Sequence, residues 1–374
     1  MRPASDVERR RLNDTFAELC RIRSVSGEEA GIVAWVAGQL EAIGVQVDRP
    51  DEAGNLLVRV KPSQPPERSI LLCAHVDTVP HDGVVEPVCV DGVWVSAGET
   101  ILGADNKAAV AVLLEVARRV AIEGAPVGLE LLLTVGEELA LAGAKAFDVG
   151  RLRSDYGFVF AHATPIGEVI VASPTYYRLE ASFHGAAAHA GIRPEAGRNA
   201  IVAAARAIAA MRLGRLDEQT TANVGAIHGG LAGTTNVVAE HASFLAEARS
   251  LDDATVEAVV AEMVDHVHDA ANTPACSCDV DVVVERLFSG YRHRPQAPGI
   301  LVAEEALRAC GYEPRHIASG GASDANALEA MGFPCFNLAN GTESNHQTDE
   351  RVSVAALEGM LDVAYALLDE ARVA

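Results

Sequence analysis

Apolar residues follow two different periods along the chain. From Gly31 to Ile43 they recur every three or four positions, which predicts an amphipathic helix. Residues 69–79 and 129–135 are nearly continuous apolar runs, which is typical of strands buried on both faces. Between them, residues 107–124 are apolar almost all round and predict a buried helix. The order strand, helix, strand favours an α/β domain, with a mixed, largely parallel sheet covered by helices.

Shorter strands are predicted at 45–49 and 55–60, on either side of the turn-rich PDEAG. After residue 300 the helical spacing returns at 301–312, and a final amphipathic helix is predicted at 354–372. These elements have the same pattern of helices and apolar strands as the first 173 residues, so we expect the two outer parts of the chain to form one domain.

The segment from 174 to 288 has a different pattern, in which four short strands with alternating apolar and polar residues and two helices are predicted. The predicted elements are a strand at 176–185, a helix at 197–212, strands at 223–230 and 242–250, a helix at 252–272 and a strand at 279–288. The order βαββαβ is that of a ferredoxin-like sandwich. We therefore predict an inserted domain at 174–288, within a catalytic domain made of 1–173 and 289–374.

The charge balance excludes several classes of partner. Thirty basic residues against 52 acidic ones give a net charge of −22, which repels nucleic acid and anionic lipid. The N-terminal residues contain no apolar stretch of signal-peptide length, and no segment has the roughly 18 apolar residues of a membrane span. We expect a cytoplasmic protein that binds neither nucleic acid nor membranes.

The first candidate ligands stand at the end of the apolar run 69–79. His75 lies where the carboxyl end of a buried strand opens into a ligand-binding crevice. Asp77 lies two residues on, hence on the same side of an extended chain, where it can accept a hydrogen bond from the second ring nitrogen of a metal-bound histidine. Taken alone, the two residues fit a buried polar pair equally well.

Two further turns carry carboxylates. Asp105 follows Gly103 at the start of the buried helix, where it is either a helix cap or a ligand. Glu137 and Glu138 end the run 129–135, and adjacent buried carboxylates are costly unless a cation neutralises them. Neighbours on a strand point in opposite directions, so one glutamate would bind metal and the other would act as general base. The alternative is a solvated acidic turn.

A second histidine, His346, lies in a glycine-marked loop after the apolar run 334–340. Together with the other candidates it makes a nitrogen and oxygen ligand set that suits zinc, manganese or cobalt. Two such ions would activate a water and polarise a carbonyl, as amide hydrolysis requires. We predict two divalent metal ions, with zinc favoured.

These residues lie in motifs that follow one another over nearly the whole chain: AHVDTVP, LGADNKAAVA, TVGEE, AAAHAGIRPEAGRNAI, GGLAGTTNVVAE, EARS, GGASDAN and GTESNHQTDE. In this order they resemble the M20 metallopeptidase family, and most closely its peptidase T-like branch. The resemblance implies hydrolysis of amide bonds in short peptides or N-acyl amino acids, in a tripeptidase-like or carboxypeptidase-like manner, by a metal-activated water.

The resemblance also implies a role for each matching residue. His75 would bind one ion, Asp105 would bridge both, Glu138 and His346 would complete the second, Glu137 would be the general base and Asp77 would orient His75. In the inserted domain, His189 would reach the active site of the other subunit of a homodimer and stabilise the tetrahedral intermediate. Substrate would be held by Asn236, by Arg249, which suits a carboxylate, and by Gly321.

One position departs from the family pattern. The family places a metal-binding carboxylate where counting back from Gly167 puts Ala161. The adjacent His162 offers a nitrogen instead, but on a regular strand it would face the other way, so it needs a local distortion. Otherwise the first site keeps only His75 and the shared Asp105 and is weak or empty. This loss leaves a second hypothesis open, a non-catalytic protein that binds a peptide or amino acid on the same scaffold.

Overall fold

The computed structural model describes residues 2–60 and 68–372. Its backbone divides into two compact units, Met1–Ser173 with Tyr291–Ala374 (unit 1) and Pro174–Gly290 (unit 2). Each unit has its own apolar core. The predicted α/β class, with a mixed sheet covered by helices and a ferredoxin-like insertion, is confirmed.

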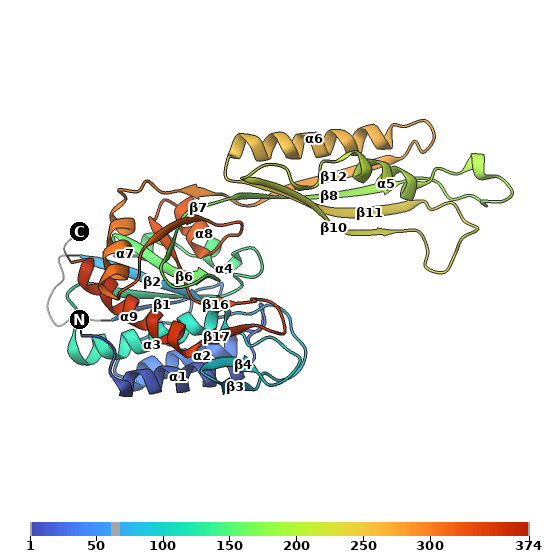
Figure 1. The fold of residues 1–374 in the computed structure, drawn as a ribbon. Helices are drawn as coiled ribbons and strands as arrows, with labels where there is room; N and C mark the ends of the chain where they lie inside the picture. Colours follow the sequence, from blue (N-terminus) through green and yellow to red (C-terminus); the bar gives the residue numbers. More distant parts are fainter. Residues whose placement is uncertain (1, 61–67, 373–374) are drawn as a thin grey trace. The chain divides into compact units, whose positions relative to one another are not determined.

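Unit 1 is built on an eight-stranded sheet in the order β1-β5-β2-β6-β15-β7-β13, with β14 also pairing with β7 (Figure 1). Strands β5, β2, β6 and β15 run parallel, whereas β1 pairs antiparallel with β5. The carboxyl ends of the parallel strands therefore meet at one edge of the sheet. The strands are β1 (Leu56–Val60), β2 (Ser69–His75), β5 (Gly128–Thr134), β6 (Tyr156–His162), β7 (Glu168–Ser173), β13 (Tyr291–Arg292), β14 (Arg315–Ala318) and β15 (Cys335–Ala339).

Helices cover both faces of this sheet. One face shares its apolar core with α1 (Asp6–Arg21), α2 (Ala30–Ala42), α3 (Ala104–Glu123), α7 (Pro298–Ala309) and α9 (Val354–Glu370). The smaller cluster on the other face lies under α8 (Asp324–Ala330), next to α4 (Ala142–Ala146), and a 3₁₀ turn spans Val149–Arg151. Helix α3 is buried over most of its length, as its apolar composition predicts.

A second, four-stranded sheet in unit 1 was not predicted. Its order is β16-β17-β4-β3, from β3 (Pro87–Val90), β4 (Val93–Ser96), β16 (Thr342–Glu343) and β17 (Arg351–Ser353). The antiparallel pair β16 and β17 closes the loop 344–350, which carries His346. The strand predicted at 45–49 is wrong, because this segment makes only one isolated bridge, from Val47 to Val58.

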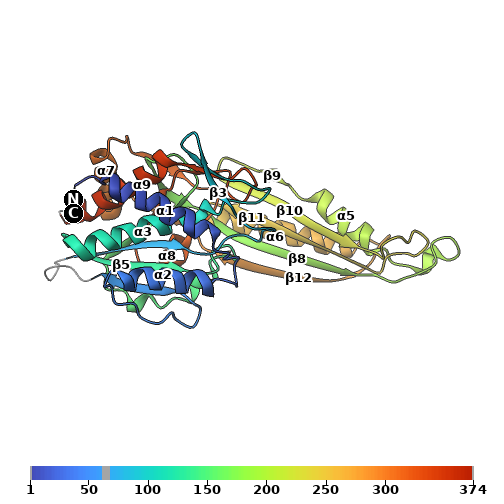
Figure 2. The same cartoon turned by 90° about the horizontal axis from the view of Figure 1, so that it is seen from below.

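Unit 2 is a five-stranded antiparallel sheet in the order β12-β8-β11-β10-β9, with both helices on one face (Figures 1 and 2). Its elements are β8 (Thr175–His184), a 3₁₀ turn (Pro194–Ala196), α5 (Ala200–Ala210), β9 (Gly214–Arg215), β10 (Thr220–Gly229), β11 (His241–Ser250), α6 (Asp253–Ala271) and β12 (Asp279–Phe288). Alternate residues of β8, such as Leu179 and Phe183, pack under the helices. The other face of the sheet carries the polar residues of the same strands.

Among the described residues, no helix combines the length and the apolar character that crossing a bilayer requires.

Candidate metal centre

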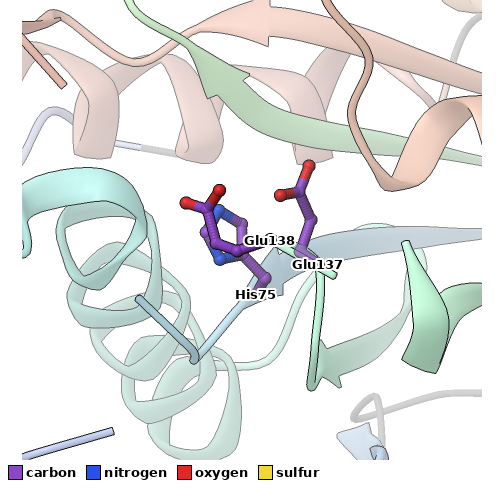
Figure 3. Close-up of side chains that lie close together, drawn as sticks. All are labelled: His75, Glu137 and Glu138. Carbon is purple, nitrogen blue, oxygen red and sulfur yellow. The ribbon is translucent and has the colours of Figure 1, made fainter. Parts of the chain in front are cut away.

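Two strands deliver the first group of side chains to the carboxyl edge of the sheet. His75 is the last residue of β2 and pairs in register with Thr134, the last residue of β5. Glu137 and Glu138 follow β5, and Figure 3 shows them beside the imidazole of His75. One ligand atom from each of these three side chains lies within 4.8 Å of the others.

The two glutamates do not point in opposite directions, as a continuing strand would require. Strand β5 ends at Thr134, and Gly136 has φ +59°, so Glu137 and Glu138 lie in a turn. Glycine adopts this left-handed conformation at little cost, whereas other residues do so rarely. The alternation argument for these two residues was therefore wrong, because the turn brings both carboxylates to the same histidine.

Asp105 lies between two histidines. Its Oδ1 is 3.3 Å from Nε2 of His75, and its Oδ2 is 3.4 Å from Nε2 of His346. Helix α3 begins after Gly103, with φ +74°, and Asp105 has non-helical backbone angles within the first turn. The helix has no side-chain cap at this end, so the alternative role of Asp105 as a cap is not observed. One carboxylate oxygen faces each histidine, which is the arrangement that a bridging ligand needs.

His346 completes a second group. Its Nε2 is 2.8 Å from Oε1 of Glu138, and the ligand atoms of Asp105, Glu138 and His346 lie within 4.8 Å of one another. The side chain of His346 is 47% exposed, unlike that of His75 at 2%. The amide of Asn345 donates a 2.8 Å hydrogen bond to Oδ2 of Asp105. Glu138 is common to both groups, so two cations could share this edge.

Asp77 connects the residues of the first group. Its carboxylate accepts hydrogen bonds from the backbone N–H of Glu137 (3.0 Å) and of Glu138 (3.1 Å), and from the hydroxyl of Ser26 (2.7 Å). Nδ1 of His75 is 3.1 Å from the carbonyl oxygen of Asp77 and 3.4 Å from its carboxylate. Asp77 therefore holds the imidazole with Nε2 toward Asp105, and it also fixes the turn that carries both glutamates.

Protonation in this cluster is strongly perturbed. Burial lowers the pKa of His75, but hydrogen bonds to neighbouring carboxylates outweigh it and hold that pKa well above its ordinary value. Burial raises the pKa of Glu137 well above its ordinary value. Hydrogen bonds to Asp105 and Glu138 raise the pKa of His346 to about 10. Protons thus occupy sites that a divalent cation would take, since metal binding needs neutral imidazoles and ionised carboxylates.

Position 161 lies two residues beyond the last residue of β6 that pairs with β2. The two strands are parallel, and their pairing ends with Cys73 opposite Val159, while His75 likewise lies two residues beyond Cys73. The methyl group of Ala161 packs against the smaller apolar cluster of unit 1. That a metal-binding carboxylate is missing at this position stays a prediction from the family pattern.

His162 stays a candidate ligand. The pairing of β6 with β15 shifts by one residue between Phe160 and His162, so β6 contains the kind of local irregularity that His162 needs to turn toward Ala161's side. Burial lowers the pKa of His162, and the charges of Glu168 and, to a smaller extent, Asp105 oppose this shift. Among the described residues, however, neither of the two ligand groups includes His162.

The predicted substrate-binding residues lie in both units. In unit 2, His189 bridges to Val237, and the N–H of Ala190 donates to the carbonyl of Asn236, so His189 and Asn236 lie on adjoining segments. Arg249 lies on β11 with its guanidinium 4.3 Å from the ring centre of Tyr176. In unit 1, the carbonyl of Gly321 accepts a hydrogen bond from the hydroxyl of Ser173.

Two buried carboxylates near the centre were missed in the sequence. Asp324 begins α8 and accepts a 2.5 Å hydrogen bond from the hydroxyl of Thr134, and burial raises its pKa to about 6. Glu350 follows His346 by four residues and contacts the turn of Asp105. Both stand in motifs that the sequence displays, GGASDAN and HQTDE, but their partners are too distant along the chain for spacing to reveal.

Two protein-family models match the chain. The peptidase dimerisation domain of the M20 peptidases matches residues 175–273, and peptidase family M28 matches residues 55–160. An uncharacterized Bacillus subtilis protein, YqjE, is 35% identical over 98% of this chain and 99% of its own length. Peptidase T of Vibrio cholerae is 27% identical over 73% of this chain and 66% of its own length.

Solved structures with similar folds include two close relatives. The aminopeptidase PepT of Bacillus cereus has a TM-score of 0.86 at 36% identity, covering 97% of this chain and 98% of that one. A tripeptidase of Staphylococcus aureus has a TM-score of 0.90 at 32% identity, with the same coverage. YxeP of Bacillus subtilis, described as a dinuclear metal-binding M20 peptidase, shares the fold at 17% identity with a TM-score of 0.72, covering 98% of this chain and 99% of that one.

Proposed function

Because the chain belongs to the M20 metallopeptidases, in their peptidase T-like branch, we propose that it hydrolyses short peptides at a centre that holds two divalent ions. The position of Asp105 carries this proposal, since one carboxylate oxygen faces His75 and the other faces His346. Family membership makes the chain an enzyme, so the hypothesis of a non-catalytic binding protein is set aside.

The residues present fit the two ions unequally. Asp105, Glu138 and His346 offer three ligand atoms within 4.8 Å of one another, which suits the second ion. The first ion would be held by His75 and Asp105, with His162 as the proposed replacement for the carboxylate that Ala161 lacks. Nitrogen and oxygen ligands without thiolates favour zinc, with manganese or cobalt as alternatives. When bound, the two ions supply positive charge that acidifies water and polarises the scissile carbonyl.

Glu137 would act as the general base. Its carboxylate belongs to the first group with His75 and Glu138 and lies outside the Asp105, Glu138 and His346 group. We assign the first ion to His75 and Asp105, which would leave Glu137 close to the centre to accept a proton from water. The same carboxyl would then donate this proton to the leaving amine. Burial favours the protonated form of Glu137, which makes it a competent acid in the second half of that transfer.

The remaining roles follow the matching motifs. Arg249 would bind the C-terminal carboxylate of a peptide, with the ring of Tyr176 and Glu247 holding its guanidinium. Asn236 and Gly321 would make further contacts with the peptide. The dimerisation-domain match supports a homodimer, in which His189 would stabilise the tetrahedral intermediate in the partner's active site.

The substrate test is a panel of dipeptides, tripeptides and N-acyl amino acids, assayed on protein that has been stripped with a chelator and reconstituted with zinc, manganese or cobalt. We expect tripeptides to be cleaved only after reconstitution. Hydrolysis confined to the N-acyl amino acids would contradict the peptide assignment.

The role of Glu137 has its own test. Glu137→Gln should lower kcat by at least about 100-fold, the size of a general acid–base contribution, while its metal content stays close to that of the wild type. An active Glu137→Gln enzyme would exclude Glu137 as the base.

A further inference from the structure

Glu350 joins two loops of the metal centre. It lies at the end of the loop between β16 and β17, and its side chain is buried, with 1% exposure. Oε2 accepts hydrogen bonds from the backbone N–H of Leu102 (2.9 Å) and of Gly103 (2.7 Å), and Oε1 accepts one from the N–H of Asp105 (2.9 Å). One carboxylate thus satisfies three backbone donors of the turn that carries Asp105.

The Gly103–Asp105 turn at the start of α3 has no N-cap side chain to accept hydrogen bonds from its backbone. The first N–H groups of a helix have no partner within the helix, and a polar side chain at the N-cap normally satisfies one of them. At the start of α3 the N-cap is Gly103, which has no side chain. Glu350 therefore supplies from a distant part of the chain the acceptor that the local sequence lacks.

The same loop contacts Asp105 at two more points. Asn345 donates to Oδ2 of Asp105 at 2.8 Å, and Nε2 of His346 lies 3.4 Å from that oxygen. Glu350 fixes the backbone of the Asp105 turn, while its own loop presents His346 to the side chain of Asp105. A displacement of Glu350 would therefore change the distance between two ligands of the second ion.

Asp77 provides a parallel on the other side of the centre. It accepts the backbone N–H groups of Glu137 and Glu138, just as Glu350 accepts those of Gly103 and Asp105. In both cases a buried carboxylate that is outside the ligand groups holds a ligand-bearing turn by its backbone.

We propose that Glu350 is a positioning residue of the metal centre: it locks the Gly103–Asp105 turn to the His346 loop so that Asp105 and His346 reach the same ion. The inference rests on the proposed metal-dependent function. Outer contacts of this kind change metal affinity by about 10- to 100-fold when they are removed. A residue that served only as a helix cap would affect folding without that change in affinity.

The test compares Glu350→Ala and Glu350→Gln with a control, Glu343→Gln. Glu343 lies on the neighbouring strand β16 and makes an exposed ion pair with Arg351. Zinc affinity is measured by competition with a chromophoric chelator, alongside kcat, KM and the melting temperature of the metal-free protein. We expect Glu350→Ala to weaken the zinc affinity of one of the two sites by about 10- to 100-fold. The value of kcat should decrease by a larger factor than the factor by which KM changes, and kcat should recover in excess zinc.

Glu350→Gln covers the case in which Glu350→Ala does not fold. The amide keeps one acceptor oxygen but turns an NH₂ group toward the third backbone donor, so we expect a smaller loss of zinc affinity in the same site. Unchanged zinc affinity in a folded Glu350→Gln protein, with only its melting temperature lowered, would overturn the proposal. If wild-type protein binds two zinc ions but hydrolyses no peptide, the proposed function fails, and the affinity measurements still decide the role of Glu350.

Discussion

In the metal-free protein, His346 holds a proton at a position where a cation would bind. Its pKa is raised from 6.5 to about 10 by Asp105 and Glu138, so the imidazole is protonated at neutral pH in the metal-free protein. A raised pKa stabilises the metal-free fold fully below the ordinary value, and this stabilisation is lost as the pH rises through about 10. Zinc needs the neutral ring, so zinc binding must expel this proton.

We therefore predict that zinc binding near neutral pH releases protons and tightens as the pH rises. Titration calorimetry in buffers of different ionisation enthalpy measures the number released. His346→Asn should release about one proton fewer than the wild type, because asparagine carries none at this position. A binding enthalpy that is independent of the buffer would contradict the protonation of His346.

Ala161 gives a second test at the scale of the residue. Ala161→Asp would return a carboxylate to the position where the family pattern places one, and we expect the affinity of the weaker zinc site to rise by roughly 10-fold or more. Ala163→Asp is the matched control, since it adds the same charge at an exposed position two residues on. If zinc affinity rises equally in both variants, the gain comes from net charge and not from a new ligand.

His162→Ala separates the two possibilities left open for His162. In the wild-type background it should weaken the first zinc site if the imidazole is a ligand. In the Ala161→Asp background it should then have little effect, because the restored carboxylate takes over the ligand position. An unchanged affinity in both backgrounds would exclude His162 from the centre.

At the scale of the element, helices and strands with long apolar runs could be predicted from the sequence, whereas polar helices and turns could not. The buried strands β2 and β5 and the helix α3 have long apolar runs in the sequence, and the candidate ligands at their ends could be predicted for that reason. Helix α1 was missed because most of its residues are polar, although Ser5 and Glu8 form a capping box at its start. The turn at Gly136 depends on backbone geometry. The hydrogen bond between Glu350 and Asp105 joins residues that are 245 positions apart in the sequence. The periodicity of apolar residues contains no information about either feature.

Helix α1 is attached to α3 by a buried ion pair. The guanidinium of Arg119 donates to both carboxylate oxygens of Glu8 at 2.8 Å and lies 3.3 Å from the ring centre of Tyr365 on α9. We predict that Arg119→Ala destabilises unit 1 by on the order of 3 kcal/mol, because Glu8 loses its buried cationic partner and keeps the half-exposed Arg2 and the hydrogen bonds from Ser5.

Differential scanning calorimetry at equal metal loading measures this loss. The control is Arg118→Ala, which removes a partly exposed arginine 3.9 Å from Glu115 and should cost less than about 1 kcal/mol. Equal losses in the two variants would show that the buried pair contributes no more than a surface pair does.

At the scale of the whole molecule, the chain separates two tasks. Unit 1 gathers every residue of the two ligand groups at one sheet edge, and unit 2 carries His189, Asn236 and Arg249. The residues proposed for metal binding and for substrate binding lie in short segments at the ends of helices and strands. Such segments form compact sequence motifs, and the order of these motifs along the chain carries the family resemblance. In the proposed homodimer, His189 would serve the active site either of its own chain or of its partner, and this question needs a test on the assembled protein.

We predict that two inactive variants restore each other's activity when mixed. In a hybrid dimer of His189→Ala and Glu137→Gln subunits, the site that keeps Glu137 would receive an intact His189 from its partner. With random exchange between the two subunit types, half of the dimers are hybrids with one working site, so activity should recover to about a quarter of the wild-type level. Peptide hydrolysis after subunit exchange measures this recovery, with each variant alone as control. If His189 instead served the active site of its own chain, every site in the hybrid would lack one residue and the mixture would stay inactive.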